Sequence, residues 1–425
     1  MDLVIRGGTL PDGSVADIGI IGETIAAIGR IDAPSATEID ATGDLVSPPF
    51  VDPHFHMDAT LSYGLPRING SGTLLEGIAL WGELRETATL EDMRDRALAY
   101  CDWAVAQGLL AIRSHVDVTD DRLLGVQALL EVKRLTAPYL DIQLVAFPQD
   151  GLYRHRAGLA NLGRALDMGV DVVGGIPHFE RTMTEGAASV RALAEIAAER
   201  GLPIDLHCDE TDDPLSRHIE TLTFETERLG LGGRATGSHL TSMHSMDNSY
   251  ASKLLPLIAE AGVAALPNPL INITLQGRHD SYPKRRGLTR VREMQALGIP
   301  VGWGQDCVMD PWYSLGSADM LDVAHMGLHV AQLTSPAEMR RCFEMVTATN
   351  AAIIGLDDYG IAVGKRASLL VLDAADPIEA IRLRAARLVV VSRGAVVARR
   401  DRAPSRLALP GRSGETRLRW NANPR

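Results

Sequence analysis

Short apolar runs separated by glycine and aspartate turns mark both ends of the chain. Runs of this length, bounded by such turns, are typical of paired β-strands. They lie at Leu3 to Ile5, Ile18 to Ile21, Thr24 to Ile28, Ser368 to Asp373, Leu388 to Val391 and Ala395 to Ala398. We therefore predict one small β domain, assembled from both ends of the chain over residues 1–47 and 360–405.

Between residues 48 and 359 the pattern changes to short apolar strands that alternate with amphipathic helical stretches, for example Glu91 to Gln107, Val190 to Glu199 and Ser252 to Ala261. This alternation is typical of parallel βα units. Eight strand candidates end near His54, His115, Gln149, His178, His207, His239, Asn268 and Asp306. Eight units in roughly 260 residues predict a (β/α)8 (TIM) barrel, so the fold class is α/β.

Composition narrows the kind of protein. The chain has 425 residues, of which 46% are hydrophobic, and this is enough apolar surface for a large core. Its net charge of −12 disfavours nucleic acids and anionic membranes as partners, because both are polyanions. No basic-then-apolar leader opens the sequence, and no apolar run approaches about 18 residues. We expect a soluble, cytoplasmic protein.

The cysteines and the tail add little chemistry. Cys101, Cys208, Cys307 and Cys342 are far apart and form no C-x-x-C pair, which excludes a disulfide scaffold and a thiolate zinc cluster. From Arg399 onward the chain is rich in Arg, Pro and Gly, and residues 406–425 are interpreted as a solvated tail, either disordered or reaching between subunits.

The strongest local motif is His54-Phe55-His56. Residues i and i+2 of a strand point to the same face, so both imidazoles would enter the barrel mouth together. Two imidazoles on one face can bind a metal ion. The alternative is two polar residues on an exposed strand face.

A second motif, His207-Cys208-Asp209-Glu210, ends another strand. A third imidazole from His207 would leave a catalytic metal an open position for water, whose pKa falls from 15.7 to about 7. Glu210 could take the proton of that water and redeliver it to the substrate. As an alternative, Glu210 caps a helix or forms an ion pair there.

His239 and Asp306 end two further strands. An aspartate after the apolar run Ile299 to Trp303 suits a core poorly unless it is paired or coordinating. His239 could steady the nucleophile or polarise the attacked centre. Each residue alone could be structural, but their joint placement at strand ends favours a metal site. The other histidines, His115 and His178 included, are interpreted as structural.

Several longer stretches carry a family resemblance: VSPPFVDPHFHMD at 46–58, VAFPQDG at 145–151, DLHCDETDD at 205–213, SHLTSMHS at 238–245 and DPWYSLGSADML at 310–321. In this order, and along nearly the whole chain, they resemble the amidohydrolase superfamily and, within it, the bacterial cytosine deaminases. The resemblance implies a distorted (β/α)8 barrel with a small β-sandwich, and a homo-oligomer.

The resemblance also implies roles for individual residues. It assigns His54, His56, His207 and Asp306 to one divalent ion, Fe²⁺ or Zn²⁺. Glu210 becomes the proton shuttle, and His239 with Asp306 orients the nucleophilic water. Binuclear relatives carry a carboxylated lysine after the fourth strand, whereas the segment Ile176 to Glu180 has no lysine, so a single ion is expected.

The implied substrate is a free cytosine-type base, deaminated to uracil or thymine with release of ammonia. Gln149 would hydrogen-bond the amide edge of the base, and apolar walls would come from Leu74, Phe147 and Trp312. The same site could instead act on isocytosine, creatinine or an amino-triazine. A catalytically silent assembly protein would keep the barrel fold without any of these activities.

One departure from the resemblance concerns substrate choice. The cytosine deaminases read Gly-His-Asp-Asp where this chain reads Gly304-Gln305-Asp306-Cys307. Cys307 therefore replaces an anionic residue that faces the substrate. Because a thiol is a softer and less polar wall, we expect the pocket to accept a 5-substituted cytosine, with 5-methylcytosine as the leading case. The alternative is neutral drift, with cytosine still preferred.

Overall fold

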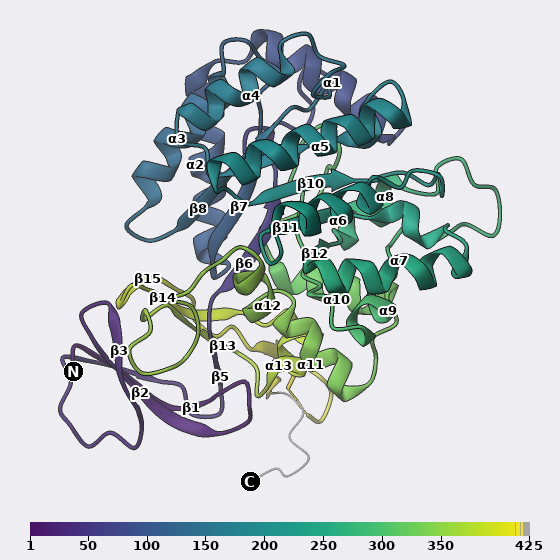
Figure 1. The fold of residues 1–425 in the computed structure, drawn as a ribbon. Helices are drawn as coiled ribbons and strands as arrows, with labels where there is room; N and C mark the ends of the chain where they lie inside the picture. Colours follow the sequence, from purple (N-terminus) through teal and green to yellow (C-terminus); the bar gives the residue numbers. More distant parts are fainter. Residues whose placement is uncertain (413, 417, 420–425) are drawn as a thin grey trace.

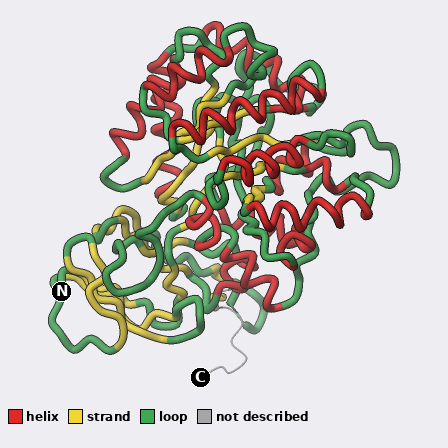
Figure 2. The backbone as a smooth tube through the Cα atoms, in the orientation of Figure 1, coloured by secondary structure: helices red, strands yellow, loops and turns green. Residues whose placement is uncertain are grey.

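The computed structural model describes residues 1–412, 414–416 and 418–419, and they form a barrel beside a smaller mixed sheet (Figures 1 and 2). Parallel strands line the barrel in the order β12-β11-β10-β9-β8-β7-β6. Their bounds are β6 Phe50–Phe55, β7 Leu109–Asp117, β8 Asp141–Phe147, β9 Val172–Gly175, β10 Ile204–Cys208, β11 Ala235–His239 and β12 Val263–Leu266. The predicted α/β barrel is confirmed.

The eighth barrel position is irregular. Only isolated bridges occupy it, one from Val301 to Ala265 of β12 and one from Asp306 to Phe55 of β6. The segment passes so close to its neighbours that a Cβ on Gly304 would stand 2.4 Å from Asn268 Oδ1. The barrel therefore closes through a few tight contacts instead of a full ladder, and this distorts it.

Helices surround the barrel strands, as the red and yellow segments of Figure 2 show. They are α1 Leu74–Thr87, α2 Leu90–Ala106, α3 Leu124–Thr136, α4 Gly158–Asp167, α5 Met183–Arg200, α6 His218–Leu229, α7 Asn248–Ala261, α8 Pro269–Leu275, α9 Val291–Ala296, α10 Met320–Val330, α11 Pro336–Glu344, α12 Ala348–Ile353 and α13 Pro377–Leu383, with short 3₁₀ turns at Pro177–Phe179 and Thr241–His244. The three predicted helices correspond to α2, α5 and α7. Helix α5 begins earlier than predicted because Thr182 caps it. Among the described helices, none has the length and apolar character needed to cross a membrane.

The eight-stranded sheet of the smaller domain, called the small sheet below, joins strands from distant parts of the chain. Its order is β15-β14-β13-β5-β1-β2-β3, with β4 paired to β1. The strands are β1 Leu3–Thr9, β2 Val15–Ile21, β3 Thr24–Gly29, β4 Thr37–Asp40, β5 Leu45–Ser47, β13 Leu369–Leu372, β14 Arg387–Ser392 and β15 Ala395–Arg399. Purple and yellow segments accordingly lie together in Figure 1. Strands from both ends of the chain pair in one sheet and share one hydrophobic core, as the sequence pattern predicted.

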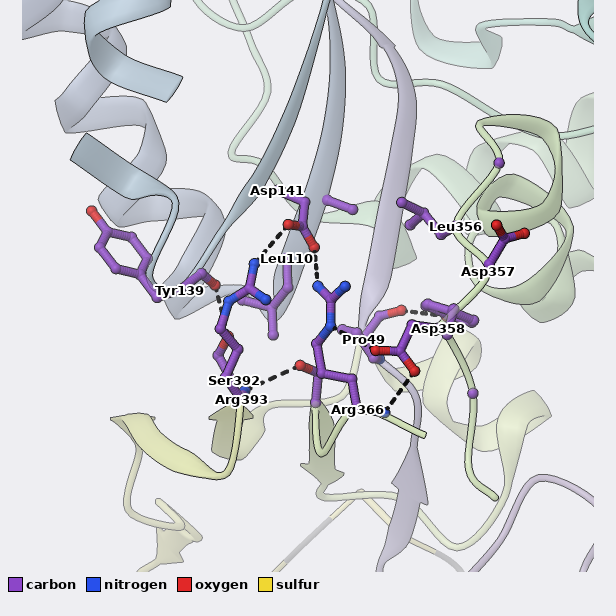
Figure 3. A pocket seen from close by; sticks show the side chains of 15 residues that line it. Pro49, Leu110, Tyr139, Asp141, Leu356, Asp357, Asp358, Arg366, Ser392 and Arg393 are labelled. Carbon is purple, nitrogen blue, oxygen red and sulfur yellow. Dashed lines mark hydrogen bonds and ion pairs between the residues drawn. The ribbon is translucent and has the colours of Figure 1, made fainter. Parts of the chain in front are cut away.

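A cavity of about 230 Å³ lies at the junction of the barrel and this sheet and is lined by residues of both (Figure 3). Asp141, the first residue of β8, lies at the amino end of the barrel. Its carboxylate accepts hydrogen bonds from Arg366 Nη1 and Arg393 Nη2, both at 2.6 Å. The carboxylate of Asp141 therefore binds two arginines that flank β13 and β14. This junction lies at the amino end of the barrel strands, opposite to the end where the strands finish.

The predicted tail, residues 406–425, lies partly outside the described residues, which omit 413, 417 and 420–425. Strands β16 Ser405–Leu407 and β17 Gly414–Thr416 pair with each other. Arg419 Nη1 contacts Asp44 Oδ1 at 3.1 Å and Asp373 Oδ1 at 3.3 Å. Most described residues of this tail are exposed, whereas the guanidinium of Arg419 is held by carboxylates next to the small sheet.

Candidate active site

The carboxyl ends of several barrel strands converge on one buried cluster of imidazoles and carboxylates. Residues from β6, β10, β11 and the eighth position meet there, because the ends of parallel strands face the same side of a barrel. The structure brings together the whole predicted set, which is His54, His56, His207, Glu210, His239 and Asp306, and each of these side chains is buried.

Three distances among the four predicted donor atoms match the spacing of ligands around one metal ion. His56 Nε2 and His207 Nε2 are 3.1 Å apart. Asp306 Oδ1 lies 3.6 Å from His54 Nε2 and 3.4 Å from His56 Nε2. Ligands at about 2.1 Å from a tetrahedral ion stand about 3.4 Å from each other. The cluster therefore fits one divalent ion.

The protonation of these imidazoles also suits a metal site. Burial, followed by the neighbouring imidazoles, lowers the pKa of His54 and of His207 well below the usual value. Both rings are therefore neutral at pH 7, and a neutral ring is the form that binds a metal ion. His54 Nε2 is buried and has no hydrogen-bond partner among the described residues.

His115 lies inside this cluster, although the sequence pattern left it outside. Its ring centroid is 4.2 Å from that of His54 and 4.6 Å from that of His207. Its ring also groups with His54 and His56 as a possible ligand set. The signal was present in the sequence, because His115 ends a predicted strand, but strand-end position alone does not say how deeply a side chain lies.

The two carboxyl groups of the cluster share a strongly perturbed environment. Burial, and then the charge of Asp306, raises the pKa of Glu210 well above its ordinary value. Burial and the charge of Asp310 act on the pKa of Asp306 in the same direction. Glu210 Oε1 has no hydrogen-bond partner in the described chain. Glu210 is therefore a group that can carry a proton at neutral pH.

A left-handed backbone conformation at Asp209 directs the next residue, Glu210, towards the barrel mouth. Asp209, just before it, has φ of 56°, a left-handed conformation that is uncommon outside glycine. Asp209 Oδ1 accepts hydrogen bonds from Ser216 Oγ at 2.6 Å and from His218 Nδ1 at 2.7 Å. These bonds attach the turn to the start of α6. Such strain costs of order 1–3 kcal/mol and is concentrated at functional sites.

Hydrogen bonds also define the state of His239. Asn272 Oδ1 accepts a bond from the backbone N–H of Asn268 at 2.9 Å, which fixes the orientation of the Asn272 amide. Asn272 Nδ2 therefore donates to His239 Nδ1, also at 2.9 Å. His239 Nδ1 must be the unprotonated nitrogen, so the proton of this neutral ring lies on Nε2.

A narrow cavity of about 20 Å³ opens onto the cluster. It is lined by His56, Leu74, Gln149, Ile176, His207, Glu210, Ile271, Leu275, Asp306, Cys307 and Trp312. Four of the five predicted substrate residues, Leu74, Gln149, Cys307 and Trp312, are in this lining. Phe147 differs, because its ring stacks on His207 at a centroid distance of 4.2 Å and lies behind the lining. Sequence reasoning missed Ile176, Ile271 and Leu275, whose apolar side chains carry no chemical signal.

Cys307 and Trp312 form one wall of the cavity. Cys307 is 3% exposed, and its Sγ lies 3.5 Å from Asp306 Oδ1. Burial raises the pKa of the Cys307 thiol, so it stays uncharged. Trp312 packs against Gly77 of α1 so closely that a Cβ there would stand 2.2 Å from Trp312 Cδ1. This wall is therefore uncharged and tightly packed.

A barrel that carries imidazoles and carboxylates at the carboxyl ends of its strands has the arrangement of a metal-assisted hydrolase. The sequence profile of the amidohydrolase family matches residues 37–398, and the chain belongs to that family. The resemblance drawn from the sequence motifs is thus confirmed.

Relatives within the family include deaminases and an aminohydrolase. A 5-methylcytosine deaminase structure from Klebsiella pneumoniae, with 5-fluorocytosine bound, is 42% identical, with a TM-score of 0.93, over 95% of this chain and 99% of that one. The N-isopropylammelide isopropyl amidohydrolase of a Pseudomonas strain is 31% identical over 93% of this chain and 97% of its own length. The pterin deaminase of Rhizobium rhizogenes is 28% identical over 91% and 86%.

Proposed function

We propose that this protein is a metal-dependent hydrolytic deaminase of a free cytosine-type base, and that 5-methylcytosine, giving thymine and ammonia, is its leading substrate. The observation that carries the proposal is the uncharged wall at Cys307, next to the cluster and inside the cavity. The deaminase similarity over nearly the full length supports it.

One divalent ion, Fe²⁺ or Zn²⁺, would be held by His54, His56, His207 and Asp306. The ion would lower the pKa of a water molecule towards 7, so that a hydroxide-like nucleophile exists at neutral pH. The spacing of the four donor atoms supports a single ion. So does Ile176, an apolar residue that lines the cavity directly after β9.

The chain's own groups move the protons. Glu210 takes a proton from the attacking water and delivers it to the ring nitrogen next to the amino-bearing carbon. This step breaks the conjugation of the ring and makes that carbon electrophilic. Glu210 then takes the remaining proton from the hydroxyl that the water has added to this carbon and passes it to the amino group. The carbon–nitrogen bond breaks, ammonia leaves, and the hydroxyl oxygen becomes the carbonyl oxygen of the product. A general acid–base group of this kind contributes a factor of about 100 to 10,000.

The remaining groups orient the reactants. His239 and Asp306 hold the water. The ring nitrogen of His239 that faces Glu210 Oε1 at 3.5 Å and Asp306 Oδ2 at 3.7 Å is Nδ1, so on this side His239 acts as a hydrogen-bond acceptor. Gln149 lines the cavity and presents an amide to the amide edge of the base. Leu74 and Trp312 enclose the ring and keep other water away from it.

Position 307 selects the substituent on the ring. A carboxylate at position 307 would add a negative charge beside Asp306 and Asp310. A substrate methyl group packed against that carboxylate would strip it of hydrating water, which is unfavourable. The Cys307 thiol carries no such penalty. We therefore expect the methyl group of 5-methylcytosine to pack against Cys307.

The test compares kcat/KM for cytosine and 5-methylcytosine in the wild type, in Cys307→Asp and in the near-isosteric control Cys307→Ser. The wild type should prefer 5-methylcytosine, Cys307→Ser should keep that preference, and Cys307→Asp should reduce it at least tenfold. Protein stripped by a chelator should lose activity and regain it with Zn²⁺ or Fe²⁺. A large preference of the wild type for cytosine would reject the substrate assignment.

A second candidate function is an aminohydrolase acting on an N-isopropylammelide-like base, and the 31% identity over nearly the full chain favours this base over isocytosine and creatinine. A panel of isocytosine, creatinine, an amino-triazine and N-isopropylammelide, with ammonia and isopropylamine measured separately, distinguishes the two candidate functions. Absence of any bound divalent ion in purified protein would favour the silent assembly protein. We also propose a homo-oligomer, which light scattering tests.

A further inference from the structure

A chain of buried polar groups runs beneath the cluster, outside the cavity. His54 Nδ1 lies 2.9 Å from Ser238 Oγ, and Ser238 Oγ lies 2.7 Å from Asp205 Oδ1. Asp205 Oδ2 accepts a bond from Arg113 Nη1 at 3.2 Å. All four side chains are at least 98% buried. A buried ion pair is often less stabilising than well-packed apolar residues of similar size, so its presence here calls for a functional reason.

The direction of each hydrogen bond in this chain is determined. Asp205 pairs with Arg113 and is ionised, so its oxygens only accept. The single hydroxyl hydrogen of Ser238 therefore points to Asp205. Ser238 Oγ is then left as an acceptor, and the hydrogen between it and His54 must belong to His54 Nδ1.

The consequence lies at the other nitrogen of the ring. With its proton on Nδ1, His54 has a free lone pair on Nε2, which faces Asp306 Oδ1 at 3.6 Å and has no other partner in the described chain. His239, at a ring-centroid distance of 4.9 Å, is held in the opposite tautomer by Asn272. Two neighbouring imidazoles thus differ in which nitrogen offers a lone pair.

We propose that Ser238 and Asp205 are positioning residues that hold His54 with Nδ1 protonated and Nε2 free, and that they thereby set the affinity of the cluster for its ion. This inference rests on the proposed function, because it needs the cluster to bind an ion. Neither residue lines the cavity. Ser238 reaches the cluster through His54, and Asp205 also faces His115 Nε2 at 3.7 Å.

The expected magnitude follows from what Ser238→Ala removes. Without the hydroxyl, His54 Nδ1–H is buried without an acceptor, and the ring can relieve this by moving its proton to Nε2. That move removes the ligand lone pair. Partners that orient metal ligands typically change metal affinity 10- to 100-fold, so we expect the dissociation constant for Zn²⁺ to rise by about that factor.

The experiment titrates Zn²⁺ into metal-free, full-length protein in competition with a chromogenic chelator. Ser238→Ala should bind Zn²⁺ about 10- to 100-fold more weakly than the wild type. The control is Ser189→Ala, since Ser189 is a buried serine of α5 whose hydroxyl donates to Gly186 O at 2.8 Å, its one hydrogen bond among the described residues. It should lower the thermal midpoint of the metal-free protein but leave Zn²⁺ affinity unchanged.

An isosteric pair covers the case in which Ser238→Ala does not fold. Ser238→Thr keeps the hydroxyl and should retain Zn²⁺ affinity within about threefold, whereas Ser238→Val has the same shape and should lose it. Equal Zn²⁺ affinity in the wild type and in the hydroxyl-free variant would overturn this inference while the proposed function stands. A wild type that binds no Zn²⁺ and no Fe²⁺ would overturn the proposed function itself.

Discussion

Replacing Gly77 by alanine should displace Trp312, which lines the cavity and whose ring centroid lies 6.1 Å from that of His56. The added Cβ would stand 2.2 Å from Trp312 Cδ1, 2.6 Å from Nε1 and 2.8 Å from Cγ. Carbon atoms in ordinary contact are about 3.5–4.0 Å apart, so the indole must retreat by about 1.3 Å or more. Gly77 has a helical backbone, so alanine itself fits there and adds about 1 kcal/mol of helix stability.

The effect on catalysis can be estimated from the packing. Trp312 lines the small cavity, and Trp81 is close to its other side, with ring centroids 6.4 Å apart. With Trp81 on one side and His56 at a ring-centroid distance of 6.1 Å, the indole can move only into the small cavity that would hold the substrate. Overpacking of this kind typically costs 1–3 kcal/mol. If this overpacking raises the free energy of the transition state by the same amount, kcat/KM falls by roughly 5- to 150-fold.

The assay is steady-state deamination of 5-methylcytosine by the wild type, Gly77→Ala and the matched control Gly82→Ala. Gly82 lies in the same helix, and a Cβ there would meet nothing within 4 Å. The control should keep its kinetics and melt slightly higher. Adding Trp312→Phe to Gly77→Ala should restore part of the activity. Unchanged kinetics in Gly77→Ala would refute the view that Trp312 bounds the substrate site.

Three further predictions concern proton transfer, pH dependence and the barrel junction. Glu210→Gln should bind Zn²⁺ as tightly as the wild type but lose a factor of about 100 to 10,000 in kcat; near-normal turnover would remove Glu210 from the mechanism. Burial raises the pKa of Asp310 from 3.8 to about 6. Between these two pH values the folded state binds more protons than the unfolded state, so the free energy of unfolding falls by up to about 3 kcal/mol as the pH rises from about 4 to about 6. Asp310→Asn should be more stable by up to that amount at pH 8 and equal to the wild type below about pH 4, as urea titrations at both pH values would show. Asp141→Ala should lower the unfolding free energy by about 1–3 kcal/mol through loss of the Arg366 and Arg393 bonds, with kcat/KM unchanged; a fall in kcat/KM would couple the junction to the site.

Strand-end reasoning predicted most of the barrel and the cluster because both depend on local pattern. An apolar run fixes where a strand lies, and its last polar residue, such as His207 or Asp306, marks the carboxyl end. All such ends meet at one face of a parallel barrel. The eighth position was predicted as a strand like the others, but among the described residues it makes only isolated bridges, from Val301 to Ala265 and from Asp306 to Phe55.

The remaining features depend on contacts between residues far apart in sequence. Phe147 was predicted as an apolar wall of the substrate site, and its stacking on His207, a residue of the cavity lining, could not be read from the sequence. The tautomer of His239 depends on Asn272 and the backbone of Asn268, and no spacing rule links these residues. Such relationships arise from packing and can be obtained only from three-dimensional structure.

The small sheet has a consequence for synthesis on the ribosome. Strand β5 ends at Ser47, and its neighbour β13 begins at Leu369, so the intervening barrel must be translated before the two can pair. At about 5–20 residues per second this takes roughly 15–65 s. During that interval the early strands present an open edge to other nascent chains. We therefore expect chaperone demand in the cell to be concentrated on this segment and to end once the last strands emerge.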